Sequence, residues 1–286
     1  PKGAVNILCG LGHVAGAALS AHPHVNQIVF TGSVPTGVAI ATAAARNVVP
    51  CVLELGGKSA AIVHDDADLE AFENDVRWGI YFNAGQVCSA MSRVIVHESR
   101  HDELVERIAF VAANLSVGPG IEHTEFGANM GAMVSEAQRD RAAGMVSDAI
   151  AAGATAAAGG RKMNIPGAFL EPTLLTGVTP DMNIANEEAF APVLSVLKFR
   201  DDAQAIEIAN GTPYGLVGGV FTRDIDRATQ AARQIRAGQI FVNEWYAGGV
   251  ETPFGGYGKS GYGREKGREA LWNYVQTKNV AIRLRS

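Results

Sequence analysis

The hydrophobic and polar positions of the chain change their spacing from segment to segment, and each spacing predicts an element. Short apolar runs bounded by turn residues predict strands, whereas apolar residues three and four positions apart predict helices. The predicted strands lie at 25–30, 50–57, 93–98, 192–199, 216–222, 238–243 and 275–284. The predicted helices lie at 34–47, 69–83, 100–115, 134–153, 202–209, 224–235 and 264–272. Because strands and helices alternate from end to end, the pattern predicts a mixed α/β fold.

The first part of this pattern has the order strand, glycine turn, helix, strand. This βαβ order, over residues 25–57, is typical of a doubly wound sheet whose first strand is buried. At the other end of the chain, the strand at 275–284 follows a glycine-rich loop at 253–263 and a short helix. We expect the edge of this last strand to be available for pairing with another chain.

Composition narrows the class of protein. The chain has 286 residues, 47% of them hydrophobic and 19% charged, which suits one large core or two domains in a soluble globular protein. Its net charge of −5 comes from interspersed acidic and basic residues without a basic face, which argues against nucleic-acid binding. No apolar run reaches the length of a membrane span. We therefore expect neither a nucleic-acid nor a membrane partner.

Three cysteines, Cys9, Cys51 and Cys88, form no CxxC pair and no zinc-binding spacing. So few cysteines suit a reducing compartment, and we expect a cytoplasmic protein without a metal site. The chain begins at Pro1 rather than at Met, so the absence of a signal peptide carries little weight.

A glycine turn in the segment FTGSVPTG is a candidate phosphate site. Gly32 and Gly37 stand between a strand and a helix, where backbone can approach an anion at the helix N-terminus. The Lys and Ser or Thr of a P-loop do not follow, and a GxGxxG fingerprint is absent. Ser33 can offer its hydroxyl to a phosphate or cap the helix. The turn alone leaves a phosphate site and a purely structural turn equally open.

Two further residues are candidates for catalysis, each with an ordinary structural explanation. Cys88, in NAGQVCSA, is a nucleophile or a small buried residue, and the second is the commoner role of a cysteine. Glu54, in LELGGKSA, stands among apolar neighbours of a predicted strand. It is either a surface carboxylate at a sheet edge or a general base whose pKa is raised by burial.

Six segments taken together resemble one known family. FTGS, LELGGKSA, GQVCSA, EEAFAPV, NGTPYGL and ETPFGGYGKSGYGRE occur in this order, with Glu54 placed 34 residues before Cys88. They resemble the hydrolytic, NAD(P)-dependent branch of the aldehyde dehydrogenase superfamily over nearly the whole chain. The resemblance implies an aldehyde dehydrogenase-like α/β fold with a partial doubly wound cofactor-binding domain at 1–56 and a catalytic domain at 57–259. Residues 260–286 would return to the cofactor domain and supply a strand for oligomerisation.

The resemblance also implies a role for each matching residue. Cys88 matches the nucleophile, Glu54 the general base that activates the hydrolytic water, and Glu265 a glutamate that relays protons. The cofactor, NAD or alternatively NADP, would be contacted by Gly32, Ser33, Gly37, Leu55, Glu188, Phe190 and Leu216. The aldehyde would reach Cys88 through a tunnel lined by Phe82, Asn243, Trp245, Tyr246 and Phe254.

The expected reaction converts an aldehyde to a carboxylic acid through a thiohemiacetal and a thioester on Cys88. A glutamate at position 54 distinguishes the hydrolytic branch of the family from the acylating branch. The alternatives are an acylating or phospho-aldehyde dehydrogenase, and a non-catalytic binding protein on the same fold. The family relationship further implies a homodimer or homotetramer.

The sequence departs from the family pattern in three places. Gly258 stands where the family has Lys, and Ala191 where it has Gly. The chain is also short for the family, so we expect it to be a C-terminal portion. The upstream part would carry the Lys for the adenosine ribose and an Asn of the oxyanion hole. We therefore expect the isolated chain to bind cofactor poorly and to turn over slowly or not at all.

Overall fold

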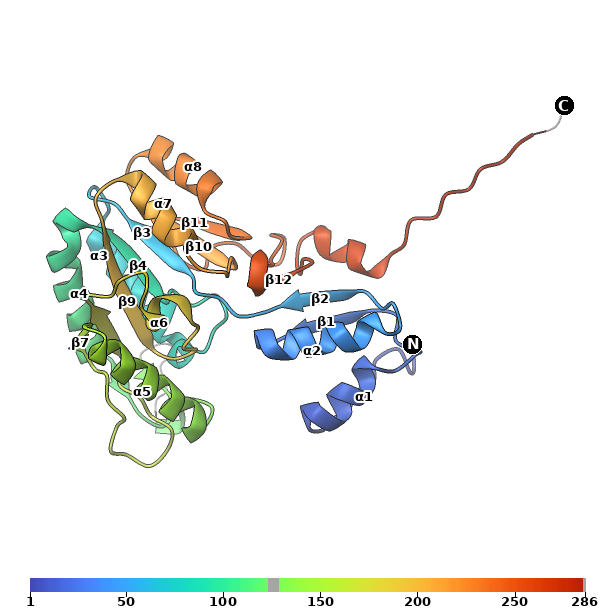
Figure 1. Cartoon of the computed structure of the whole chain (residues 1–286), viewed down its shortest axis with the longest axis horizontal. Helices are drawn as coiled ribbons and strands as arrows, with labels where there is room; N and C mark the ends of the chain where they lie inside the picture. The colour runs from blue at the N-terminus through green and yellow to red at the C-terminus, as the bar shows by residue number, and fades with distance from the viewer. Residues whose placement is uncertain (123–128, 285–286) are drawn as a thin grey trace. The chain divides into compact units, whose positions relative to one another are not determined.

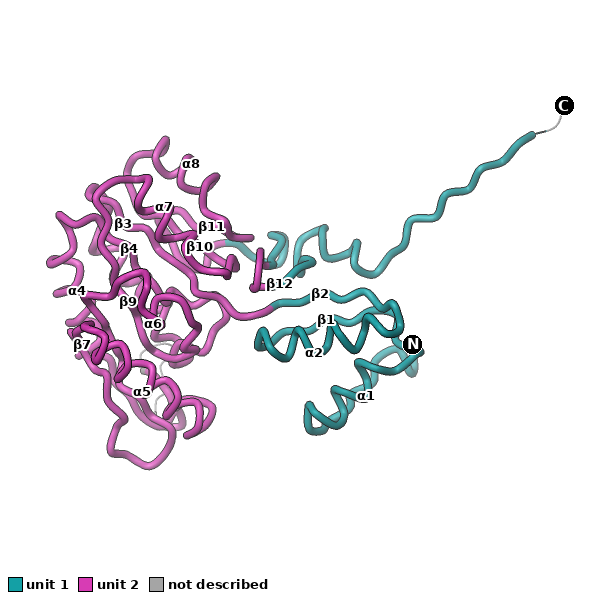
Figure 2. The backbone as a smooth tube through the Cα atoms, in the orientation of Figure 1, with its two compact units in different colours: residues 1–54, 248–255, 261–286 teal, residues 55–247, 256–260 magenta. Residues whose placement is uncertain are grey.

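A computed structural model describes residues 1–122 and 129–284 of the chain (Figure 1). Packing divides these residues into two compact units (Figure 2). Unit 1 comprises residues 1–54, 248–255 and 261–286, and unit 2 comprises residues 55–247 and 256–260. Both ends of the chain therefore belong to unit 1. Each unit is described below by itself.

Unit 1 is built on a three-stranded sheet in the order β1-β2-β12. Strands β1 (Ile28–Thr31) and β2 (Cys51–Glu54) are parallel and are joined through helix α2 (Val34–Ala45), whereas β12 (Gly261–Tyr262) runs antiparallel to β2. Helix α2 begins where Ser33 accepts a hydrogen bond from the Thr36 N–H. The predicted βαβ order of residues 25–57 is thus confirmed.

The rest of unit 1 corrects three predictions. Strand β1 is not buried, because its side chains alternate between half-buried and exposed. A 3₁₀ helix at Glu269–Tyr274 replaces the helix predicted at 264–272. Residues 275–284 form no strand and are exposed. A strand needs a neighbour for its backbone hydrogen bonds, and no described strand pairs with this segment.

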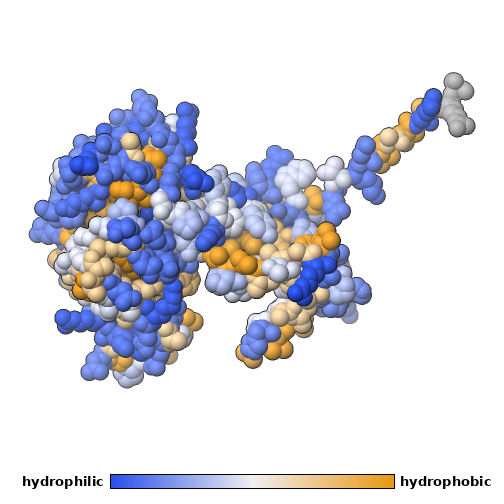
Figure 3. All heavy atoms as spheres, viewed as in Figure 1, coloured by the Kyte–Doolittle hydropathy of each residue, from blue (hydrophilic) through white to orange (hydrophobic). Residues whose placement is uncertain are grey.

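The N-terminal part of unit 1 contains a π-helical turn at Gly12–Gly16 that leads into the short helix α1 (Ala17–Ser20). Many apolar side chains here remain exposed, and Figure 3 shows apolar residues at the surface of this part of the chain. They include Val5, Ile7, Leu8, Leu11 and Val14.

Unit 2 is built on a seven-stranded sheet in the order β11-β10-β3-β4-β9-β8-β7 (Figure 1). Neighbouring strands are parallel except for β7 and β8, which are antiparallel. The strands are β3 (Ala60–Val63), β4 (Arg93–His97), β7 (Thr155–Ala158), β8 (Thr173–Thr176), β9 (Val193–Phe199), β10 (Val217–Phe221) and β11 (Gln239–Val242). A separate two-stranded sheet pairs β5 (Ser116–Val117) with β6 (Asn129–Met130).

Among the described residues, unit 2 contains six α-helices. They are α3 (Leu69–Val76), α4 (His101–Asn114), α5 (Glu136–Ala151), α6 (Asn183–Asn186), α7 (Asp202–Asn210) and α8 (Ile225–Gln234). Asp68, Ser135, Asp201 and Asp224 cap four of them through their side chains. The central strands β3, β4 and β10 are almost entirely buried, as expected for parallel strands covered on both faces. The mixed α/β fold predicted from the sequence is confirmed.

Unit 2 also contains elements that the pattern did not predict. Strand β3 follows the Gly56–Gly57 pair so closely that its apolar run reads as an extension of the preceding strand. Strands β7 and β8 are each four residues long and lie between the helix predicted at 134–153 and the strand predicted at 192–199, where we predicted no element. The helix predicted at 69–83 is α-helical only as far as Val76 and continues as a π turn at Arg77–Tyr81.

Candidate active site

Cys88 lies in a tight turn between the end of the π-helical segment and strand β4. The turn is closed by the Ala90 N–H, which donates to the Val87 carbonyl at 3.0 Å. The Met91 N–H donates to the Gly79 carbonyl at 2.7 Å and fixes the turn against the preceding helix. Cys88 is half-buried, and no disulfide involves any of the three cysteines, all of which are described.

The backbone leading into this turn is strained. Asn83 and Ala84 have φ values of +52° and +54°, in the left-handed region that side chains disfavour. Gly85 follows at +68°, and a Cβ there would collide with the Ala191 carbonyl oxygen. Side-chain amides of Asn83 and Gln86 each donate to the other's carbonyl, at 3.0 and 3.1 Å, and hold this conformation. Strain of this kind concentrates at functional sites.

The Gly56–Gly57 pair lies against three other candidate residues of unit 2. The Gly57 N–H donates to Oε1 of Glu188 at 3.1 Å, and a Cβ on Gly56 would collide with the same carboxylate. A Cβ on Gly57 would lie 2.8 Å from the Cys88 carbonyl oxygen and 3.3 Å from Cβ of Leu216. Only glycine permits this approach. Leu216, Glu188 and the Cys88 turn therefore meet at Gly57.

Phe190, two residues after Glu188, is another strained residue. It has a φ of +50° and is 37% exposed. Helix α5 holds the backbone around it: Gln138 Nε2 donates to the Ala189 carbonyl at 2.9 Å, and the Arg141 guanidinium donates to the Glu188 carbonyl at 3.2 Å. The sequence motifs gave no sign of Gln138 or Arg141, because the contacts of these residues join segments about fifty residues apart.

Glu54 is the last residue of β2 in unit 1 and is 2% exposed. Neither carboxylate oxygen has a hydrogen-bond partner within the described residues. Burial raises the pKa of Glu54 to about 8, the nearby Glu265 adds to the rise, and Arg264 opposes it. A carboxyl group with such a pKa is poised to exchange a proton near neutral pH. The interpretation of Glu54 as a surface carboxylate is wrong, because its side chain is buried.

Glu265 and Phe254 face each other across an isolated antiparallel bridge of unit 1. The Phe254 N–H donates to the Glu265 carbonyl at 2.8 Å, and the Glu265 N–H donates back at 2.7 Å. Gly255, next to Phe254, has no side chain, and a Cβ there would lie 2.8 Å from Oε1 of Glu54. The bridge therefore places the glycine-rich loop beside the Glu54 carboxylate.

The glycine turn of unit 1 is held to the end of β2. The Gly32 N–H donates to the Glu54 carbonyl at 3.0 Å. The Ser33 hydroxyl accepts from the Thr36 N–H at 3.4 Å and contacts the Thr36 hydroxyl at 2.9 Å, so its capping role is confirmed. Gly32 and Ser33 are exposed, whereas Gly37 is buried within α2.

The aromatic residues expected in a substrate tunnel differ in burial and in their contacts. Trp245 is buried and donates through Nε1 to the Ser89 carbonyl at 3.2 Å, next to Cys88. The Tyr246 hydroxyl donates to the Gly79 carbonyl at 3.4 Å, and burial raises the pKa of Tyr246 to about 12. Phe82 is exposed, with its ring 6.0 Å from that of Trp78. Phe254 lies in the other unit.

Asn243 has a different set of contacts. Its side-chain oxygen accepts from the Thr222 N–H at 2.9 Å, and its nitrogen donates to the Thr222 carbonyl at 2.8 Å. Both polar atoms of the amide are thus used to join the ends of β10 and β11. This pairing spans 21 residues, so the sequence pattern gave no sign of it.

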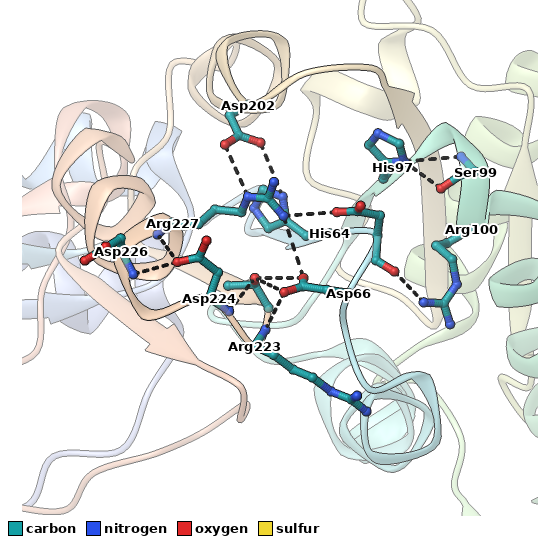
Figure 4. Close-up of polar contacts among 12 residues, drawn as sticks. His64, Asp66, His97, Ser99, Arg100, Asp202, Arg223, Asp224, Asp226 and Arg227 are labelled. Carbon is teal, nitrogen blue, oxygen red and sulfur yellow. Dashed lines mark hydrogen bonds and ion pairs between the residues drawn. The ribbon is translucent and has the colours of Figure 1, made fainter.

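A second group of charges lies at the C-terminal end of β3, and we call His64, Asp65, Asp66, Asp202 and Arg227 the polar cluster (Figure 4). Arg227 pairs with Asp65 at 3.0 Å and with Asp202 at 3.3 Å. Asp66 accepts from the Thr222 hydroxyl at 2.8 Å and from the Arg223 N–H at 3.0 Å. His64 lies 3.5 Å from Asp202. The cluster ties the β3–α3 loop to the starts of α7 and α8.

Neither group of charges resembles a metal centre. Within residues 1–122 and 129–284 no three His, Cys, Asp or Glu side chains are grouped as metal ligands would be. In the same residues, no helix has the length and apolar character needed to cross a bilayer.

A family model described as "Aldehyde dehydrogenase family" matches residues 1–280. The chain belongs to the aldehyde dehydrogenase family. An aldehyde dehydrogenase of Alternaria alternata is 44% identical over 99% of this chain and 57% of its own length. A mitochondrial aldehyde dehydrogenase of Leishmania tarentolae is 42% identical over the whole chain and 57% of its own length. The chain thus spans little more than half the length of these curated relatives.

A solved aldehyde dehydrogenase has the same fold. The betaine aldehyde dehydrogenase of Staphylococcus aureus, in complex with NAD⁺, superposes with a TM-score of 0.90 at 37% identity. The match covers 94% of this chain and 55% of that one. The aldehyde dehydrogenase-like fold expected from the ordered motifs is therefore confirmed.

Proposed function

We propose that the protein oxidises an aldehyde to the carboxylic acid with NAD⁺ or NADP⁺, with Cys88 as nucleophile and Glu54 as general base. The observation that carries the proposal is the state of Glu54: a buried carboxyl group without a hydrogen-bond partner in the described residues, and with a pKa raised by burial to about 8. It stands three residues before Gly57, whose backbone lies against the turn of Cys88. A structural carboxylate would be paired or exposed.

In the proposed reaction, the Cys88 thiolate attacks the aldehyde carbon and forms a thiohemiacetal. Backbone N–H groups of the Cys88 turn stabilise the oxyanion. A bound nicotinamide cofactor supplies the acceptor for the hydride. The resulting Cys88 thioester is attacked by a water whose proton passes to Glu54, and the carboxylic acid leaves as the thiol is restored.

Several features of the chain suit a nicotinamide cofactor. The exposed glycine turn at Gly32 precedes the N-terminus of α2, where backbone N–H groups favour a pyrophosphate. The half-buried Glu188 carboxylate, fixed by Gly57, can accept hydrogen bonds from ribose hydroxyls. Phe190, Leu55 and Leu216 supply apolar contacts for the ring. Gly37, buried within α2, and Ser33, engaged as the cap, would contribute through their backbone near the phosphates.

The proposal includes the remaining expected roles. Glu265 relays the proton from Glu54, and Phe82, Trp245, Tyr246 and Phe254 line the approach of the aldehyde. Residues 1–56 and 260–286 form the cofactor-binding part and residues 57–259 the catalytic part. The segment 275–284 gains strand partners only when a second copy is present, in a homodimer or homotetramer. We keep the cytoplasm as the proposed compartment, although one relative is named as mitochondrial.

The nucleophile is tested by replacing single cysteines. With an aldehyde and NAD⁺ or NADP⁺, we expect Cys88→Ala to abolish formation of the reduced cofactor. The matched control Cys51→Ala, which removes a half-buried thiol of β2, should retain the wild-type rate. Equal rates for Cys88→Ala and wild type would refute the proposed mechanism. If product formation required coenzyme A, the acylating alternative would replace the hydrolytic one.

A further inference from the structure

Lys58 is a buried lysine that the proposed reaction does not use. Its side chain is 2% exposed, and Nζ has no hydrogen-bond partner in the part of the chain that the structure describes. It follows Gly57 directly, at the start of the segment that leads into β3. Burying an unpaired ammonium is unfavourable, so the position calls for a compensating charge.

Among the charges that act on Lys58, the one with the largest effect is positive. Arg93, in β4, is also buried, and its guanidinium donates to the Lys58 carbonyl at 3.0 Å. It also donates to the carbonyls of Ile208 and Ala209, each at 2.8 Å, near the end of α7. Because these three carbonyls are neutral, Arg93 keeps its full charge. It opposes the charge on Lys58 rather than balancing it.

The compensating charge comes from the Glu187–Glu188 pair that follows α6. The Glu188 carboxylate accepts a hydrogen bond from the Gly57 N–H, and Gly57 is the residue before Lys58. The carboxylate is therefore held next to the backbone that leads into the lysine. Burial lowers the pKa of Lys58 to about 7, with Arg93 and Arg141 acting in the same direction and Glu188 and Glu187 opposing them. Burial likewise raises the pKa of Glu188. The hydrogen bond from the Gly57 N–H and the positive charges of Lys58 and Arg141 act to lower it.

Lys58 and Glu188 do not form a direct ion pair, because no N–O distance within 4.0 Å joins them. A cavity of about 10 Å³ borders Lys58, Arg93 and Tyr214. That is about the space that one buried water molecule needs. Any effect of the ammonium on Glu188 therefore acts through space and not through a direct ion pair.

We propose that Lys58 is a positioning residue whose buried ammonium holds the Glu188 carboxylate ionised and against Gly57, and so sets the affinity for the nicotinamide cofactor. The effect on cofactor affinity rests on the proposed function, whereas the coupling between Lys58 and Glu188 does not. Lys58 touches neither substrate nor cofactor in this proposal. Its influence reaches the cofactor through Glu188.

A double-mutant cycle tests the coupling. Lys58→Met keeps the length of the side chain without the charge, and Glu188→Gln removes the carboxylate charge. We expect each variant to raise the KM for the cofactor by about tenfold with a much smaller change in kcat for saturating cofactor, and the double variant to be no worse than either. Lys198→Met, at an exposed position of β9, is the control and should combine additively with Glu188→Gln. Additive effects of Lys58→Met and Glu188→Gln would overturn the proposal.

A pH series separates positioning from simple packing. The charged groups facing Lys58 are Arg93 on β4, Arg141 on α5 and the Glu187–Glu188 pair. Wild type should bind cofactor more tightly than Lys58→Met at pH 6, where the ammonium is present. The two dissociation constants should converge as the pH rises past the pKa of Lys58. A ratio that stays constant from pH 6 to 9 would contradict a role for the charge.

Thermal unfolding without cofactor keeps the two proposals distinguishable. If wild type neither binds cofactor nor oxidises aldehydes, the proposed function fails. The unfolding midpoints of wild type, Lys58→Met, Glu188→Gln and the double variant still measure the coupling. Non-additive shifts of the unfolding midpoint would then support the coupling with Glu188, and additive shifts would reject it. Should Lys58→Met not fold, Lys58→Gln replaces it in the cycle.

Discussion

The polar cluster at the end of β3 and the segment from Glu54 to Lys58 differ in how far their charges are exposed and paired. In the polar cluster each carboxylate has a partner: Asp65 and Asp202 pair with Arg227, and Asp66 binds Thr222 and the Arg223 backbone. In the segment, the carboxylate of Glu54 and the ammonium of Lys58 are buried and lack hydrogen bonds within the described residues.

We attribute the difference to separate roles, a structural one for the polar cluster and the proposed catalytic and positioning roles for Glu54 and Lys58. Paired charges in the polar cluster hold a loop and two helix starts together. Hydrogen bonds from Thr222 and the Arg223 N–H outweigh burial and lower the pKa of Asp66, which favours its charged form. Unpaired buried charges destabilise the fold, so a sequence retains them where their perturbed pKa values are useful. If this account is correct, mutations in the two regions should have opposite effects on activity and stability.

The largest expected effect follows from Glu54→Gln. Loss of a general base lowers the rate of the step that it assists by about 10²–10⁴-fold, so steady-state production of carboxylic acid should fall by that factor. Stability at pH 7 should not fall, because the variant removes a buried ionisable group that has no partner. Acid production and the urea midpoint of the same samples check both parts. Unchanged acid production would remove Glu54 from the mechanism.

The pH dependence of stability sharpens the comparison, because the two regions should have opposite signs. Burial raises the pKa of Glu54 to about 8, so the folded state retains a proton that the unfolded state loses. Relative to Glu54→Gln, wild type should therefore lose stability as the pH rises from about 4.5 to about 8.

Asp66 should behave in the reverse way. Burial acts to raise its pKa, but hydrogen bonds from Thr222 and the Arg223 N–H outweigh burial and lower it. Relative to Asp66→Asn, wild type should lose stability as the pH falls through the lowered pKa of Asp66. Urea unfolding at several pH values measures both differences, and slopes of the same sign would contradict the contrast.

At neutral pH, Asp66→Asn should reduce stability without affecting catalysis. The variant weakens the contacts with Thr222 and the Arg223 backbone, which we expect to lower the unfolding midpoint by about 4 °C. The rate for saturating substrate should remain that of wild type. Glu70→Gln, on the exposed side of α3, is the matched control and should leave the midpoint in place. A loss of activity in the folded Asp66→Asn protein would contradict a purely structural role for the polar cluster.

The smallest effect is expected at the rim of the polar cluster. Arg223 reaches Asp68 at 3.7 Å, and 74% of its side chain is exposed. Exposed pairs of this kind contribute less than about 1 kcal/mol, so Arg223→Gln should shift the urea midpoint very little. A shift as large as that of Asp66→Asn would mean that the exposed pair supports the cluster.

The sequence indicated candidate reactive residues more readily than their surroundings. Cys88 and Glu54 lie in contiguous motifs, so roles for them could be proposed without the fold. The burial of Lys58 could not be predicted, because an isolated lysine is normally exposed and the residues beside it, from β4, the end of α7 and β10, are distant in the sequence. The contacts of Asn243 could not be predicted for a similar reason, since its partner Thr222 lies 21 residues away.

The fold likewise contains elements that local sequence predicted and elements that depend on distant neighbours. Long elements with clear periodicity, such as α4 and β9, were predicted close to their observed bounds. Strand β3 was missed because only five residues, including the Gly56–Gly57 pair, separate it from β2. The segment 275–284 has the apolar alternation of a strand, but alternation alone cannot supply the neighbour that a strand requires.

The most direct test of the central claim traps the acyl group on Cys88. An activated ester such as p-nitrophenyl acetate acylates a thiolate without any cofactor, so the experiment depends only on the nucleophile and the base. Intact-protein mass spectrometry at pH 8 should show a short-lived acetyl adduct in wild type and a persistent adduct at Cys88 in Glu54→Gln. An adduct that decays equally fast in both proteins, or that forms at another residue, would contradict the assignment of Cys88 and Glu54.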